Sequence, residues 1–156
     1  MKYPINFNRI NRKMEYYDEI IKCHSHATEY IKSYYWCKEI KGSSLYTNLG
    51  WVLCIFLFDI VNASSEEDNL LWLIVGDIPS MYLDVFGPKT TIQVLELYSA
   101  LAEDWIKQIK SGGSIDECYP FKANPTTEMA ELLQLKVNQI KNNLIPNIDE
   151  ISIQPL

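Results

Sequence analysis

Two carboxylates and a phenol follow an apolar run in the middle of the chain. The run is Leu70 to Val75, and the three side chains are Asp77, Tyr82 and Asp84. Such groups perform general acid–base chemistry if a cleft raises the pKa of one of them. The structural alternative is that Asp77, two residues before Pro79, accepts backbone amides of a turn, as aspartate commonly does. A small hydrolase or ligand-binding domain is therefore one hypothesis, and it requires the three side chains to converge.

A cysteine and a histidine could together face a metal ion. Cys23 and His26 are three residues apart in a segment with helical periodicity, which brings side chains to the same face. Cys23 also belongs to the apolar stripe of that segment, and no second pair of ligands stands at a suitable spacing. We therefore expect a packed cysteine beside a surface histidine, with no metal and no cofactor. Motifs of nucleophilic catalysis and phosphate binding are also missing, and the prediction is that the protein is not an enzyme.

The placement of charge is more informative than any of these groups. The chain has 20 acidic and 14 basic side chains, a formal net charge of −6. Between Gly42 and Pro88 there is no lysine or arginine, and the six acidic residues there are Asp59, Glu66, Glu67, Asp68, Asp77 and Asp84. The remaining 14 acids balance the 14 bases, so the whole surplus belongs to this segment. A one-sided field speeds encounter with a basic partner; the alternative is that these are solvated loop carboxylates. The same lack of bases argues against binding of nucleic acid.

These residues must be positioned by helices and strands that the apolar pattern predicts. A long helix is expected from about Asn11 to Ile40, because apolar residues recur there at spacings of three and four. The dense apolar runs Trp51 to Val61 and Leu70 to Val75 favour a β-hairpin, although the first run could also be a buried helix. If the hairpin pairs symmetrically, Asp59 and Asp77 face opposite sides of the sheet.

Two more helices are expected in the C-terminal half. Thr90 and Gln93 form a possible capping box for the first, which the glycines at 112 and 113 end. Asn124-Pro125 precedes the second, and Pro146 closes it. The tail from Ile148 is either an edge strand or frayed. The predicted fold is one α+β domain over residues 1–156: a small antiparallel sheet packed by a long N-terminal helix and two C-terminal helices.

The cysteines and the N-terminus predict a cytoplasmic protein. The N-terminal residues do not resemble a secretory signal, and the apolar run from Trp51 to Phe58 is too short to cross a membrane. We expect four free thiols. Cys54 should be packed and inert and Cys118 reachable, while Cys23 and Cys37 lie about 21 Å apart on a continuous helix, too far to pair.

The segment Leu71-Trp72-Leu73-Ile74-Val75-Gly76-Asp77-Ile78-Pro79-Ser80-Met81-Tyr82-Leu83 resembles an uncharacterised family of small acidic bacterial proteins. In that family a tryptophan-containing strand runs into Gly-Asp-Leu-Pro-Thr-x-Tyr, followed by a helix that carries a tryptophan and by a final apolar helix. The likeness covers roughly Trp36 to Ile145, with Ser80 and Met81 departing from the usual residues. It implies an α+β fold and no particular reaction.

A looser resemblance is to immunity proteins, which bacteria encode beside secreted polymorphic or type VI toxins. These are often acidic single domains of this size that bind and block a toxin. The resemblance implies a monomer or weak homodimer that contacts neither nucleic acid nor membrane and binds a cognate toxin with a basic surface. The expected partner-binding residues are Glu66, Glu67, Asp68, Asp77, Tyr82, Asp84 and Tyr46.

Overall fold

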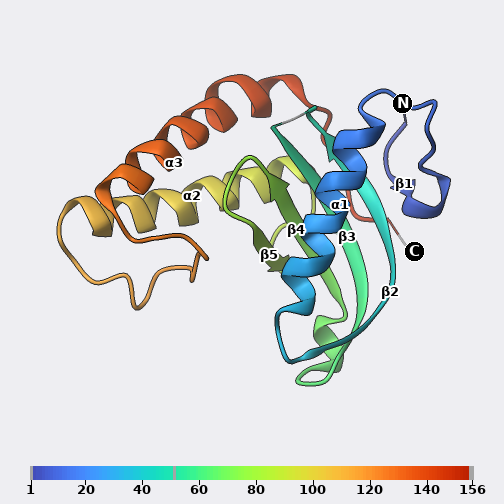
Figure 1. The fold of residues 1–156 in the computed structure, drawn as a ribbon, viewed down its shortest axis with the longest axis horizontal. Helices are drawn as coiled ribbons and strands as arrows, with labels where there is room; N and C mark the ends of the chain where they lie inside the picture. Colours follow the sequence, from blue (N-terminus) through green and yellow to red (C-terminus); the bar gives the residue numbers. More distant parts are fainter. Residues whose placement is uncertain (1, 51, 155–156) are drawn as a thin grey trace.

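The computed structural model describes residues 2–50 and 52–154. Its centre is a five-stranded antiparallel sheet in which each strand pairs with the next along the chain (Figure 1). The strands are β1 (Ile5–Asn6), β2 (Cys37–Asn48), β3 (Leu53–Asn62), β4 (Leu70–Gly76) and β5 (Met81–Asp84). The helices are α1 (Tyr17–Lys32), α2 (Thr91–Lys110) and α3 (Thr127–Gln139). The sheet is therefore a simple meander with β1 and β5 at its edges.

Alternation along β3 and β4 explains why both faces of the sheet are covered. Leu53, Ile55 and Leu57 belong to a core with α2 and α3, whereas Phe56 and Phe58 belong to a second core with α1. Because successive side chains of a strand point to opposite faces, a continuous apolar run requires a layer of helix on each side. Figure 1 shows α1 against one face of the sheet and α2 on the other, with α3 alongside α2.

The expected α+β architecture and the central hairpin are confirmed. Leu53 pairs with Gly76 and Asp59 with Leu70 in one unbroken register. In this register Asp59 pairs with Leu70, which lies an odd number of residues before Asp77. The two aspartates therefore face opposite sides of the sheet, as expected. Trp51, the first residue of the predicted strand, lies outside the described residues.

The predicted extent of the first helix was wrong. Helix α1 begins at Tyr17 and ends at Lys32, and the chain from Cys37 onward is β2. Cys37 and Ile40 continued the helical spacing by coincidence, and the residues from 41 to 44, expected to end a helix, lie inside a strand that contains bulges. Cys23 and Cys37 therefore do not share a helix, so the distance deduced from a continuous helix does not apply.

The C-terminal half largely follows the expectation. The hydroxyl of Thr90 accepts a hydrogen bond from the Gln93 amide, and the Gln93 side chain accepts one from the amide of Lys89 rather than that of Thr90. Helix α3 continues into a π-helical turn over Ile140–Leu144 and a 3₁₀ turn over Ile145–Asn147. Up to residue 154, where the described part of the chain ends, the tail makes a single β-bridge, from Ser152 to Thr90, and forms no strand of the sheet. Among the described residues, no helix is both long and apolar enough to cross a membrane.

Candidate functional site

The acidic residues of the central segment gather at one end of the sheet, with one exception. Glu66, Glu67 and Asp68 form a short 3₁₀ helix, η2, in the loop between β3 and β4. Asp84 ends β5 and pairs with Leu71, close to the start of β4. Asp77 follows Gly76 at the far end of β4. Five residues of extended chain separate these ends by roughly 17 Å, so Asp77 does not belong to the same surface as Glu66, Glu67, Asp68 and Asp84.

A cavity of about 210 Å³ lies at the acidic end of the sheet. Two aromatic and two carboxylate side chains line it, namely Trp36, Tyr82, Asp68 and Asp84. The remaining lining residues are Asn62, Ser64, Ser65 and Leu71. Glu66 and Glu67 of η2 are exposed and do not line the cavity, whereas Asp68 is half-buried. The cavity thus combines aromatic rings with negative charge.

The aromatic wall of the cavity belongs to a larger group of rings. We define the aromatic cluster as Tyr30, Tyr34, Trp36 and Tyr82. Tyr34 stacks on Trp36 with ring centroids 5.1 Å apart, and Tyr82 meets both edge-on at 5.1 and 5.3 Å. Such geometries are favourable for aromatic pairs. The rings come from α1, the turn after it and β5, so tertiary packing holds the exposed part of the cluster in place.

A lysine side chain of the protein itself already lies on this cluster. The Nζ atom of Lys122 is 4.7 Å from the ring centroid of Tyr34 and 5.3 Å from that of Tyr30. It also donates a hydrogen bond to the hydroxyl of Ser33. The faces of aromatic rings attract cations within about 6 Å of the centroid. The cluster therefore binds one ammonium group within the fold, on rings next to the cavity.

A chain of tyrosine hydroxyls connects the cluster to the edge of the sheet. Tyr34 donates to Tyr30 at 3.3 Å, and Tyr30 contacts the hydroxyl of Tyr119 at 3.0 Å. Tyr119 donates to the carbonyl oxygen of Tyr82, so its single hydroxyl proton is used and Tyr30 must be the donor of their pair. Burial raises the pKa of Tyr119 to about 12 and raises the pKa of Tyr82 as well. The Tyr119 hydroxyl therefore acts as a neutral hydrogen-bonding group.

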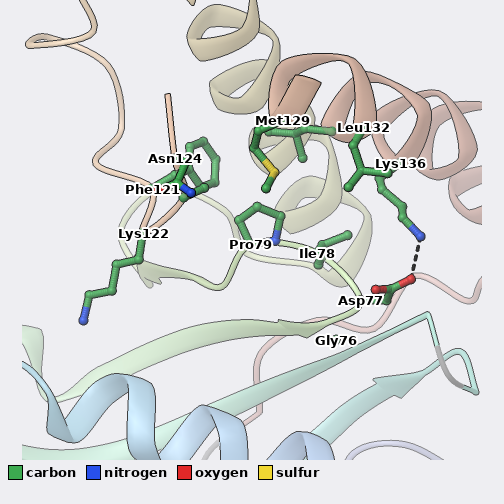
Figure 2. A pocket seen from close by; sticks show the side chains of 12 residues that line it. Gly76, Asp77, Ile78, Pro79, Phe121, Lys122, Asn124, Met129, Leu132 and Lys136 are labelled. Atoms are coloured by element: carbon green, nitrogen blue, oxygen red, sulfur yellow. Dashed lines mark hydrogen bonds and ion pairs between the residues drawn. The ribbon is translucent and has the colours of Figure 1, made fainter. Parts of the chain in front are cut away.

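A separate and larger cavity, of about 690 Å³, lies between the β4–β5 loop and α3. Figure 2 shows Met129 and Leu132 of α3 facing Ile78 and Pro79 of the loop, with Lys136 reaching toward Asp77. The Nζ of Lys136 is 2.6 Å from Oδ2 of Asp77 at the rim. The walls are mainly apolar, and the charged side chains that line the cavity are this ion pair and Lys122.

The backbone conformation at position 76 explains why a glycine precedes Asp77 at this turn. Its φ angle is +145°, and a Cβ atom at this position would lie 2.3 Å from the carbonyl oxygen of Val52. The amide of Asp77 donates to the same Val52 oxygen at 2.9 Å. The hydroxyl of Tyr98 then donates to the carbonyl of Pro79 at 2.7 Å. The Gly-Asp-Ile-Pro segment is thus a tightly packed turn that directs the Asp77 side chain outward, toward Lys136.

The structure does not bring Asp77, Tyr82 and Asp84 together. Asp77 lines the large cavity, whereas Tyr82 and Asp84 line the small one at the other end of β4. It is Asp84, not Asp77, that accepts backbone amides of its own turn, from Phe86 at 2.9 Å and Gly87 at 3.2 Å. The hypothesis of a catalytic site built from these three residues is therefore wrong, because the strand register separates them.

The prediction that Tyr46 belongs to the partner surface is also wrong. Its ring is only 1% exposed and packs edge-on against Trp72, with centroids 5.0 Å apart. Its hydroxyl accepts a hydrogen bond from the amide of Gln154 at 3.0 Å. Tyr46 lies in β2, the strand that the sequence did not reveal, and it is a core residue that cannot anchor a partner.

The histidine and cysteine positions have structural roles. Within residues 2–50 and 52–154, no three His, Cys, Asp or Glu side chains are arranged to hold a metal ion. The Nε2 atom of His24 contacts the Ser43 hydroxyl at 2.9 Å, and its ring stacks on Phe7. All four cysteines are free, with Cys54 fully buried and Cys118 partly exposed. A hydrogen bond from Cys54 lowers the pKa of Cys23, and the same contact raises that of Cys54.

Comparison of the chain with family models, with curated proteins and with solved structures finds no match. Function must therefore be inferred from the surface and the cavities.

The residue that sequence analysis missed at the acidic end is Trp36. The predicted helix from Asn11 to Ile40 includes Trp36, whereas this residue lies in the connection to β2 and forms a wall of the small cavity. The available signal was local: three consecutive aromatic residues, Tyr34, Tyr35 and Trp36, are more typical of a strand or an interface than of a helix interior.

Proposed function

We propose that the protein is an immunity-type protein that binds a cognate bacterial toxin in the cytoplasm and blocks it. The proposed contact is the acidic–aromatic surface, which we define as Trp36, Glu66, Glu67, Asp68, Tyr82 and Asp84. The observation that carries this proposal is the small cavity, where the carboxylates of Asp68 and Asp84 lie beside the rings of Trp36 and Tyr82.

The charge of this surface favours a basic partner. Four carboxylates belong to η2 and the end of β5, in a segment of the chain without lysine or arginine. Within the described residues the two ion pairs are Lys136–Asp77 and Lys141–Glu103, so none of these four carboxylates is neutralised by an ion pair. Uncompensated charge on one end of a protein steers oppositely charged partners toward it and mainly raises the association rate.

The aromatic residues would supply binding energy, whereas the charges mainly raise the association rate. Tryptophan and tyrosine carry much of the energy of protein interfaces when they are rigid and lie near the centre of the contact. Trp36 and Tyr82 are held by each other and by Tyr34, and Tyr35, in the same turn, is 80% exposed. The combination of rigid rings with a charged rim supports a tight protein contact more than it supports catalysis.

The test is made with the protein encoded beside this chain. If that protein is toxic when expressed in a sensitive host, we expect co-expression of this chain to restore growth and the two purified proteins to form a stoichiometric complex. A matched pair of variants locates the contact: Trp36→Ala should lose protection, whereas Leu135→Ala, at an exposed residue of α3, should keep it. A non-toxic neighbour that belongs to a metabolic operon, or a toxin that this chain neither binds nor neutralises, would contradict the proposal.

A second candidate function is binding of a small amphipathic ligand beneath α3. Its support is the cavity of about 690 Å³, which falls in the range of roughly 300–1,000 Å³ for ligand sites. The apolar part of the ligand would lie against Met129, Leu132 and Pro79. Its anionic group would pair with Lys136 in place of the Asp77 carboxylate. The fluorescent probe anilinonaphthalene sulfonate has this chemistry. Its binding should weaken in Lys136→Met and persist in Lys141→Met, whose ion pair with Glu103 lies outside the cavity. Equal effects of the two variants would contradict this candidate.

A further inference from the structure

The small cavity at the acidic end has the dimensions of a receptor for a single side chain. Its volume of about 210 Å³ is below the roughly 300 Å³ at which small-molecule sites begin. It is nevertheless large enough for several water molecules, each of which occupies about 30 Å³ in the liquid. A group that enters it would meet the edge or face of Trp36 and Tyr82 and the carboxylates of Asp68 and Asp84.

The chemistry of the walls selects a cation. Oδ1 of Asp84 is occupied by the amides of Phe86 and Gly87, which leaves Oδ2 for a ligand. Asp68 uses its backbone groups within the loop: its amide donates to Ser65 and its carbonyl accepts from Asn62. Its carboxylate forms no ion pair within the described residues. Two carboxylates in one small cavity favour a positively charged occupant over a neutral one.

The aromatic cluster provides an independent sign that cations bind here. Lys122 already places its ammonium group over Tyr34 and Tyr30, on the part of the cluster that lies outside the cavity. Trp36 and Tyr82 belong to the same group of packed rings, and none of the described lysine or arginine side chains lines the cavity with them. The fold thus uses one half of the cluster for its own lysine and presents the other half to the surface.

We propose that this cavity is the receptor for an arginine side chain of the protein partner. A guanidinium group is planar, so it can stack on an aromatic ring, and its five N–H donors can reach two carboxylates and the neighbouring hydroxyls at once. The ammonium of lysine lacks both properties. The inference rests on the proposed function, because it names the group of the basic partner that the acidic–aromatic surface recognises.

The experiment uses a small probe, so that it does not depend on the toxin. N-acetyl-arginine N-methylamide is titrated into the ¹⁵N-labelled protein at 150 mM salt, and the indole N–H signal of Trp36, assigned with Trp36→Phe, is followed by NMR. The control probe is the citrulline analogue, which has the same shape without the charge. The arginine probe should shift the Trp36 signal to saturation and bind at least tenfold more tightly than the citrulline probe. Equal binding of the two probes, or no shift of the Trp36 signal, would overturn the inference.

A matched pair of double variants tests the two carboxylates. Asp68→Asn with Asp84→Asn removes two charges from the cavity and leaves an amide oxygen that can still accept the amides of Phe86 and Gly87. Glu66→Gln with Glu67→Gln removes two charges from exposed positions of the same loop. The first pair should weaken binding of the arginine probe at least tenfold and the second less than twofold, with dispersed NMR spectra showing that both fold. Similar losses in the two pairs would show that only the general field matters and would overturn the inference.

The inference and the proposed function can fail separately. Toxin neutralised normally by the protein with Asp68→Asn and Asp84→Asn would remove the arginine receptor and keep the immunity function. An arginine-specific cavity in a protein that neutralises no toxin would keep the arginine receptor and remove the immunity function.

Discussion

The hydroxyl oxygen of Tyr119 lies 3.0 Å from the amide nitrogen of Tyr82 and 3.2 Å from its carbonyl oxygen. Tyr82 is in β5, the edge strand, and these two backbone groups point away from β4. Exposed edge groups are sites at which other chains can add a strand. A side chain from the loop after α2 therefore satisfies the unpaired edge of the sheet at the point where the acidic–aromatic surface begins.

Removal of this hydroxyl should destabilise the fold. Tyr119→Phe leaves the Tyr82 amide, its carbonyl and the Tyr30 hydroxyl without their partner, and unsatisfied groups of this kind cost about 1–3 kcal/mol. Chemical denaturation should show a loss of that size. Tyr35→Phe removes a hydroxyl from a ring that is 80% exposed and should change the free energy of unfolding by less than about 0.5 kcal/mol. Equal stability of Tyr119→Phe and the unmodified protein would show that water replaces the hydroxyl.

Gly76 should tolerate no side chain. Gly76→Ala places a Cβ atom 2.3 Å from the Val52 oxygen in a backbone conformation with φ of +145°, and we expect a loss of about 2–4 kcal/mol in unfolding free energy. Gly42→Ala is the control, because nothing lies within 4 Å of its added Cβ and its φ is not positive. Thermal melting of the two variants compares them directly, and similar melting temperatures would contradict the tight turn.

His24 should make stability depend on pH. Burial lowers the pKa of His24 to about 4, whereas an unfolded histidine titrates near 6.5. Between these two pH values the His24 imidazole is protonated in the unfolded chain and neutral in the folded chain. The free energy of unfolding therefore falls as the pH is lowered through this window. The full shift corresponds to about 3 kcal/mol, and because His24 is partly exposed, solvent screening makes the effect on stability smaller than that. Urea denaturation at pH 7 and pH 4.5 should show a smaller decrease in His24→Gln than in the unmodified protein. The other histidine, His26, is exposed, and His26→Gln should keep the whole decrease; an unchanged decrease in His24→Gln would be the contrary result.

Cys118 should react slowly although it is partly exposed. Its pKa is raised by burial and then by the neighbouring carboxylate of Asp104. Only the thiolate is alkylated, so its rate with iodoacetamide should reach half of its maximum at a higher pH than that of a free cysteine. Asp104→Asn should lower that pH. Mass spectrometry of the Cys118 peptide gives the rate, and a midpoint at or below that of free cysteine would contradict the raised pKa.

The sequence predicted the elements whose signals are local. The hairpin of β3 and β4 was visible as two dense apolar runs around a polar loop, and α2 was visible from Thr90 and its capping partner Gln93. Strand β2 was hidden because Cys37 and Ile40 happen to continue the period of α1. Strand β5 spans only Met81–Asp84, which is too short for a pattern.

The candidate site was predictable only in part. The acidic segment was evident from composition, and the hairpin register already implied that Asp77 and Asp68 lie at opposite ends of β4. The aromatic cluster joins residues 30, 34, 36 and 82 with Lys122, and these contacts arise from the packing of distant segments. No spacing in the sequence indicates these contacts, so Trp36 is not among the predicted anchors. The prediction for Tyr46 is wrong for another reason, because strand β2 is hidden in the sequence.

The central claim is that a basic toxin binds at the acidic end of the sheet, and the most direct test is the salt dependence of the association rate. The rate constant for binding to the toxin is measured between 50 and 500 mM salt (about a threefold change in screening length) for the unmodified protein and for Glu66→Lys, Glu67→Lys and Asp68→Lys combined. For the unmodified protein we expect a rate that falls steeply with salt. The triple variant should associate at least tenfold more slowly at low salt, with little salt dependence. Identical rates and identical salt dependence for the two proteins would contradict binding at this surface.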